Sequence, residues 1–221
     1  MATVTTAQIE SAARRRLNAV SSQFWSSAEV IEDCLYFALV DLCTRVKCYE
    51  RVSSSTTTVA GTAEYTKPSG CIEIRQMTYD NQKLERMDQR EFFAQNLTGT
   101  TAIQGRPTHY ILWGNTVTLF PTPDEAKTLK IWFTSEPVTV TSGTDISTIC
   151  PPQFHPRLVN GVVYYMVLKE TEDPRIPIFE NRWLNRDIPD CIDEFRRLKH
   201  ADKNPRVRLE ETSVTQDTGI V

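Results

Sequence analysis

Apolar residues recur at helical intervals near the start of the chain, which predicts a first helix over residues 5–20. Thr5 and Gln8 stand three positions apart, the spacing of a capping box at the start of a helix. The consecutive arginines at 14–16 fan over about 200° of this helix, so they form no narrow basic stripe. The apolar positions of the helix are Ile9, Ala12, Ala13, Leu17 and Val20.

A second helix is predicted from about residue 28 to residue 49, with Ser26 as its N-cap and Glu29 completing another capping box. Its apolar positions cover more than half of the circumference, so the helix needs more than one packing partner. One partner is the rest of the subunit, and the other could be a neighbouring subunit. The positions expected to pack subunits together, on this helix and on a later one, are Val30, Leu35, Phe37, Leu42, Val46, Leu158, Val162 and Tyr165.

Residues 51–150 change to short β-branched and alternating runs, which predict five or six strands. The clearest hairpin spans residues 110–120 around Gly114-Asn115, because a tight two-residue turn favours residues that accept positive φ. The Asp-Asn-Gln sequence at 80–82 indicates another turn. The middle of the chain is therefore expected to be rich in β-structure.

Aromatic residues in this middle region could belong to a core, an interface or a ligand site. Asp88 can cap a short helix whose Phe92 and Phe93 are expected to face inward. The four tryptophans fall one to an element, which is typical of core or interface positions. A carbohydrate-binding face would require Trp113 and Trp132 to be exposed together on one side of a sheet.

Two further helices are predicted at residues 156–170 and 175–199, and Pro189 is expected to kink or interrupt the second. Residues 201–221 lack aromatics and are mostly polar, which predicts an extended or disordered tail. Strands grouped between helices imply an α+β fold with an antiparallel sheet. The expected architecture is a helical bundle of two N-terminal and two C-terminal helices, with an inserted antiparallel β-rich region and an extended C-terminal tail.

The same pattern divides the chain into parts. Residues 1–50 and 151–200 form the expected helical part, residues 51–150 the β-rich part, and residues 201–221 the flexible tail. With 221 residues, the chain fits one domain or one domain with an appendage. No internal repeat is visible.

Charge argues against a nucleic-acid-binding protein, because such proteins concentrate positive charge on one surface. The chain has 25 Lys and Arg against 28 Asp and Glu, for a net charge of −3. The polar N-terminus predicts no signal peptide, and the lack of a long apolar run predicts no membrane span.

No nucleotide-binding, hydrolase or zinc-protease motif is present, so no catalytic residue, metal site or cofactor is predicted. The histidines at 109, 155 and 200 lie in separate segments without ligand spacing, and His155 is interpreted as a cap or packing residue. Adjacent acidic pairs point about 100° apart on a helix, so they form no facing dyad. The cysteines match no zinc signature and are interpreted as buried free thiols, although their even number also allows disulfides; they are Cys34, Cys43, Cys48, Cys71, Cys150 and Cys191.

The order and spacing of several short motifs resemble those of the head-to-tail adaptor (connector) proteins of tailed bacteriophages. Each motif alone is ordinary cap or turn chemistry, and together they cover roughly residues 5–200. The matching segments read FWSSAEVI (24–31), EYTKP (64–68), IEI (72–74), KLERMDQREF (83–92), GRPTHY (105–110), VTLFPTP (117–123) and PQFHPRLV (152–159). The last is one residue tighter than the family pattern, and Lys67 stands where an apolar residue is commoner.

The resemblance implies a structural, non-enzymatic virion protein at the head–tail junction, assembled in the host cytoplasm. Its copies would form a ring, twelvefold in most relatives, between the portal and the tail or nozzle protein. Double-stranded DNA would pass through the ring without specific binding. The helices would pack laterally and the β-rich part would project toward the tail. The C-terminal tail would reach the portal, through Lys203, Arg206, Val207, Arg208, Leu209, Ile220 and Val221.

Three other readings stay open from the sequence. The chain could be a tail or baseplate component, or a head-completion protein with a different docking site. It could be a module that binds carbohydrate on a host surface. It could be an enzyme whose active site assembles from distant segments, a reading that the missing motifs disfavour.

Overall fold

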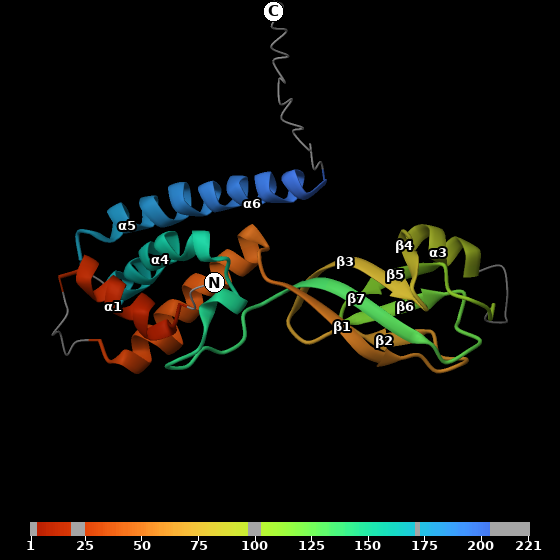
Figure 1. The fold of residues 1–221 in the computed structure, drawn as a ribbon. Helices are drawn as coiled ribbons and strands as arrows, with labels where there is room; N and C mark the ends of the chain where they lie inside the picture. The colour runs from red at the N-terminus through yellow and green to blue at the C-terminus, as the bar shows by residue number, and fades with distance from the viewer. Residues whose placement is uncertain (1–3, 19–24, 97–102, 171–172, 204–221) are drawn as a thin grey trace, which may run out of the picture.

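The computed structural model describes residues 4–18, 25–96, 103–170 and 173–203. Figure 1 shows two parts side by side: helices from both ends of the chain on one side, and a curled β-sheet carrying one short helix on the other. The chain crosses between the parts after the second N-terminal helix and returns after the last strand.

The N-terminal helices begin where the capping boxes predict. Helix α1 (Thr6–Arg16) starts after Thr5, whose backbone N–H donates to Gln8 Oε1 at 3.0 Å. The second helix is continuous and comprises η1 (Glu29–Leu35), α2 (Tyr36–Asp41) and η2 (Leu42–Val46), of which the first and last are π-helical. Lys47 ends it in the left-handed region at φ 60°.

The C-terminal helices cover the N-terminal pair. Two short 3₁₀ turns, η3 (Ile146–Thr148) and η4 (Pro152–Phe154), lead into α4 (His155–Leu168). A last long helix comprises α5 (Ile176–Arg182), η5 (Trp183–Asp187) and α6 (Ile188–Lys203). The interruption predicted at Pro189 takes the form of the π-helical turn η5 just before it, since proline removes one backbone donor. Because α6 continues to Lys203, the backbone at 201–203 is helical.

Seven strands in the described part of the chain form one sheet in the order β1-β7-β3-β4-β5-β6-β2. The predicted hairpin at 110–120 is present, and Gly114 takes φ 53° at its turn. The β3–β4 hairpin turns through two residues with positive φ, Asp80 and Asn81. The strands are β1 (Glu50–Thr57), β2 (Glu64–Thr66), β3 (Cys71–Tyr79), β4 (Gln82–Arg86), β5 (His109–Trp113), β6 (Thr116–Phe120) and β7 (Thr128–Ser135).

The predicted architecture, a helical bundle with an inserted antiparallel region, is wrong. The fold is α+β, but its sheet is curled and mixed, and it is a principal layer of the molecule. The mixed character comes from β4 and β5, which run parallel and pair Glu85 with His109 and Arg86 with Tyr110. Parallel neighbours need a crossover connection, which here contains α3 (Gln89–Asn96).

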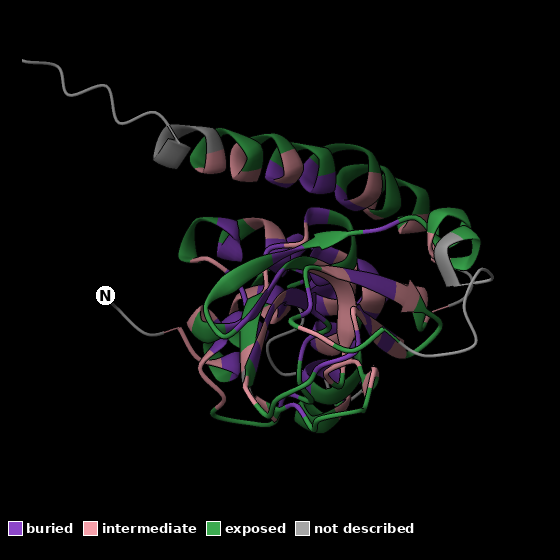
Figure 2. Ribbon diagram, turned by 90° about the vertical axis from the view of Figure 1, so that its right-hand side faces the viewer, coloured by how far each residue is buried: buried purple, intermediate pink, exposed green. Residues whose placement is uncertain are grey.

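Each part has its own hydrophobic core, and Figure 2 shows the buried positions gathered inside while the outer side of the last helix is exposed. The helical core is centred on Trp183 and Phe154, both fully buried. The two parts meet through ion pairs that include Lys47 with Glu73 and Lys199 with Glu50. The sheet core consists of Met77, Tyr79, Leu84, Tyr110, Val117, Leu119, Leu129, Ile131 and Phe133.

Candidate docking surfaces

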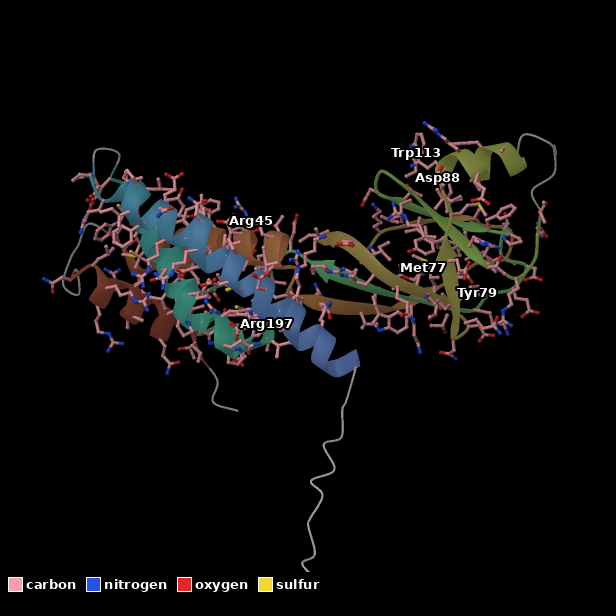
Figure 3. The ribbon with its side chains drawn as sticks, turned by 90° about the horizontal axis from the view of Figure 1, so that it is seen from above. Arg45, Met77, Tyr79, Asp88, Trp113 and Arg197 are labelled. Carbon is pink, nitrogen blue, oxygen red and sulfur yellow. The ribbon has the colours of Figure 1, made fainter. Side chains whose placement is uncertain are left out.

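An aromatic cluster lies where α3 rests on the outer face of the sheet, far from the helical part (Figure 1). Phe92 packs edge-on against Phe120 with ring centroids 5.7 Å apart. Phe93 stands perpendicular to Trp113 at 6.0 Å. Phe93 is 47% exposed and Trp113 is 58% exposed, and Figure 3 shows Trp113 beside α3. We call Phe92, Phe93, Trp113 and Phe120 the distal aromatic cluster.

The expectation that Phe92 and Phe93 face inward holds for one of them only: Phe92 is half-buried against Phe120 of the sheet, whereas Phe93 is exposed. No residue from 89 to 94 is buried, so α3 adds little to the core. Large exposed aromatic side chains grouped on one face are typical of surfaces that bind another macromolecule. The sequence marked Trp113 as core or interface, and its exposure places it on the surface.

A cleft of about 300 Å³ opens beside this cluster. Strand pairing sets its floor, because Thr118 stands opposite both Glu64 and Ile111, and Thr116 stands opposite Trp113. The cleft therefore combines an aromatic wall with threonine hydroxyls and one exposed carboxylate. This small mixed surface can receive an apolar side chain and satisfy a nearby polar group.

The residues predicted to pack subunits separate into two groups. Phe37 is 49% exposed and Tyr165 is half-buried, and their rings lie 5.6 Å apart on the surface. The others are part of the chain's own helical core, where a neighbouring copy does not reach them in this conformation. They are Val30, Leu35, Leu42, Val46, Leu158 and Val162. A wide apolar arc on the helix reflects packing on α1, α4 and α6, so only Phe37 and Tyr165 remain candidates for subunit contact.

The predicted portal-binding residues cannot be placed as a site. Lys203 is the last residue of α6, and its side chain lies outside the described residues. The rest also lie outside the described part of the chain: Arg206, Val207, Arg208, Leu209, Ile220 and Val221. Their role remains a prediction.

A partly buried set of hydrogen bonds around Asp41 joins the helices beneath the Phe37–Tyr165 pair. The Asp41 carboxylate accepts hydrogen bonds from Tyr165 Oη at 2.8 Å and from Trp183 Nε1 at 2.9 Å. Burial and the adjacent carboxylate raise the pKa of Tyr165 above its ordinary value. The hydrogen bonds at Asp41 join α2, α4 and η5, so the surface pair stands on a rigid support.

A second polar chain joins α1 to the C-terminal helices. Arg16 donates to Asn160, and Asn160 Nδ2 donates to Asp187 Oδ2 at 2.6 Å. Burial, with the like charge of Arg182, lowers the pKa of Arg16. A buried amide and carboxylate that are both hydrogen-bonded fix the orientation of neighbouring helices.

The residues weighed for chemistry occupy structural positions. All six cysteines are unbridged, and all but Cys71 are buried. His155 is buried, and its Nε2 lies 3.0 Å from the carbonyl oxygen of Cys150. This is the environment expected of a packing residue. Within the described ranges, no three His, Cys, Asp or Glu side chains are grouped so as to hold a metal ion. Over the same ranges, no helix has both the length and the apolar character to cross a membrane.

These features define an α+β protein with an exposed aromatic cluster on its sheet and, among the described residues, no grouped metal ligands. Residues 4–186 match the family described as SU10 adaptor protein, and the chain belongs to that family. It is therefore a phage head-to-tail adaptor, a structural component of the virion that contacts other virion proteins. Among curated proteins, none matches the chain.

Proposed function

We propose that this adaptor forms a ring, twelvefold as in most adaptors that it resembles, between the portal and the tail or nozzle protein. The observation that carries the proposal is the family match over residues 4–186, which includes the whole sheet and the helical part up to η5. The ring would surround the path of the DNA during ejection. Residues 1–50 with 151–200 would act as one functional part and residues 51–150 as another.

The distal aromatic cluster suits the tail-facing side of such a ring. It lies on the sheet, away from the helical part, and exposes Phe93 and Trp113. Aromatic side chains give large contact area at low entropic cost, which makes them frequent hot spots in interfaces. We propose that this cluster contacts the next tail protein, and that residues beyond Lys203 contact the portal.

The proposed adaptor works by geometry and carries out no chemical step. It converts the surface of the portal into one that the tail protein recognises. A net charge of −3 gives the chain no overall attraction for the DNA phosphates, as suits a conduit through which DNA passes. The hydrogen bonds at Asp41, partly buried, and at Asn160, fully buried, would keep the shape of each subunit constant while partners dock.

Electron microscopy of the purified protein, alone and mixed with its cognate portal, tests this proposal. A second tier on the portal supports the adaptor ring, and image symmetry gives the copy number. A protein that stays monomeric and ignores the portal would refute the ring and favour a tail or baseplate component. Binding to the tail protein without the portal separates those two outcomes.

A further inference from the structure

We propose that neighbouring copies of this chain join by a heterologous contact, in which an aromatic strip on one copy fits an apolar groove on the opposite side of the next. The inference rests on the ring proposed above and names the surfaces that hold it together. Its occupant is a second copy of the same chain, for the reasons of shape, placement and charge that follow.

The aromatic strip lies on the outer side of the second helix. It consists of the exposed Glu32, Asp33 and Phe37 and the half-buried Tyr36 and Val40, of which Tyr36 also packs against the helical core. Its apolar centre is built from rings, with the Tyr36 and Phe37 centroids 6.1 Å apart. Phe37 also packs on Tyr165, whose hydroxyl donates to Asp41, so the strip is held in place from below. Phe37 is 49% exposed, so about half of its ring is available to a partner.

The apolar groove runs between α1 and the start of α4 and has a volume of about 810 Å³. Its walls are mostly aliphatic and proline side chains, with Arg16 and Gln153 among its polar lining. An aromatic side chain buries roughly 150–250 Å² when it enters such a site, so two rings and a valine suit a groove of this size. The apolar residues that line it are Val4, Ile9, Ala12, Pro152, Pro156 and Val159.

The strip and the groove lie on opposite sides of the helical part. Phe37 of the strip packs on Tyr165 of α4, whereas Pro156 and Val159 of the same helix line the groove. Helix α4 shows the same separation, because Val159 and Tyr165 are six residues apart and point roughly 120° away from each other. When the strip of one copy binds the groove of the next, the pair still has one free strip and one free groove. Further copies can therefore add until the chain of copies closes into a ring.

Charge supports a side-by-side arrangement. Glu32 and Asp33 on the strip and Arg15 on α1 are exposed, and none has an ion-pair partner among the described residues. The last turns of α1 meet the start of the second helix, since Arg14 Nη2 donates to the carbonyl of Trp25 at 2.7 Å. The acidic and basic ends therefore lie at the same end of the helical part, on opposite sides.

Copies placed side by side in the same orientation bring these ends together. Arg15 of one copy then faces Asp33 of the next, while Tyr36 and Phe37 enter the groove. Complementary charge at the rim selects this register and disfavours the reversed one. All sheets project in the same direction, so every distal aromatic cluster faces the same side of the ring.

Cross-linking on the assembled portal tests the contact directly. A chain carrying both Arg15→Cys and Asp33→Cys is bound to the portal and treated with a short bismaleimide. We expect a ladder of dimers, trimers and larger species from the double variant. Neither single variant should give more cross-linked product than the unmodified chain. The unmodified chain controls for cross-links through the half-exposed Cys71. Dimers from a single variant would show a symmetric contact and overturn the proposal.

A mixing experiment tests the same contact without new cysteines. Phe37→Arg disables the strip, and Pro156→Asp places a charge in the groove at the first turn of α4, where an acidic residue suits a helix. Each variant alone should associate roughly 30-fold or more weakly than the unmodified chain. Mixed together, they retain one working strip and one working groove, so they should form dimers and nothing larger. Circular dichroism checks that both variants fold.

The outcomes separate this contact from the adaptor proposal. Ile178→Arg is the matched control, because it changes an exposed apolar residue of α5 that belongs to neither the strip nor the groove, and it should leave the tier on the portal intact. If Phe37→Arg forms the same tier as the unmodified chain, the contact is refuted and the adaptor proposal stands. If the unmodified chain forms no tier, the adaptor proposal itself fails.

Discussion

The indole of Trp183 fills the space beside Gly161 that any larger residue would need. A Cβ placed on Gly161 would lie 2.7 Å from Trp183 Cζ2, well inside van der Waals contact. Trp183 is fully buried in η5, and Gly161 lies in the middle of α4. Glycine is therefore required here by close approach of two helices, despite its cost in a helix interior.

Gly161→Ala should destabilise the protein by about 1–3 kcal/mol, because a buried indole and its neighbours must move to admit a methyl group. Chemical denaturation monitored by tryptophan fluorescence measures this change. Gly105→Ala is the matched control: its Cβ would meet nothing closer than Pro121 Cβ at 3.9 Å. Equal effects at the two positions would show that packing against Trp183 is unimportant.

Asp41→Ala should cost about 2–3 kcal/mol, because it leaves the Trp183 N–H and the Tyr165 hydroxyl without their acceptor. Tyr165→Phe removes only one of these donors and should cost about 1 kcal/mol. The difference in the free energy of unfolding between the two variants measures the bond to Trp183 together with the partly exposed ion pair of Asp41 with Arg45. If both variants lose the same amount, the indole bond contributes nothing.

The protein should lose stability at acidic pH, in part through Glu29. Hydrogen bonds from Lys169 and then from Ser26 lower the pKa of Glu29 from 4.5 to about 2. Because the folded pKa is depressed, this contribution is present above pH 4.5 and is lost as the pH falls toward 2. Glu29→Gln should therefore show a smaller loss of stability over that range, measured by thermal unfolding at several pH values. An unchanged slope would contradict the role of Glu29.

Trp113→Ala should lower the free energy of unfolding by no more than about 1.5 kcal/mol, since at this exposed position it removes mainly the edge-to-face pair with Phe93. It should nevertheless weaken attachment of the tail protein, because the exposed indole is proposed as part of that contact. Binding of the purified tail protein to portal–adaptor complexes measures the effect. Trp113→Phe, which keeps an aromatic ring, should retain more binding than alanine.

Truncation after Lys203 should weaken docking to the portal and leave the fold intact, because α6 ends there. Circular dichroism checks the fold, and co-sedimentation with portal particles measures docking. Normal docking of the truncated chain would refute the proposed role of residues 204–221. Substituting only Arg206 and Arg208 by serine then tests the contribution of charge.

Local sequence patterns predicted most helices and turns because their causes are local. In the capping boxes that begin at Thr5 and Ser26, two residues three positions apart each accept a hydrogen bond from the other's backbone N–H. Both boxes are formed. Gly114 adopts the positive φ of its turn without steric cost because it has no Cβ. The resemblance to phage adaptors also rested on local motifs in a fixed order, and the family match confirms it.

The arrangement of the sheet and the exposure of particular apolar residues were decided by tertiary structure. The parallel pairing of β4 with β5 covers only Glu85–His109 and Arg86–Tyr110, too short a match to leave a signal in either strand. Phe37 and Leu42 belong to one apolar helix, yet only Leu42 is covered, because the positions of α1, α4 and α6 determine which side of the helix is buried. Periodicity tells which residues share a face, whereas contacts between distant segments determine whether that face meets the core, a neighbouring copy or solvent.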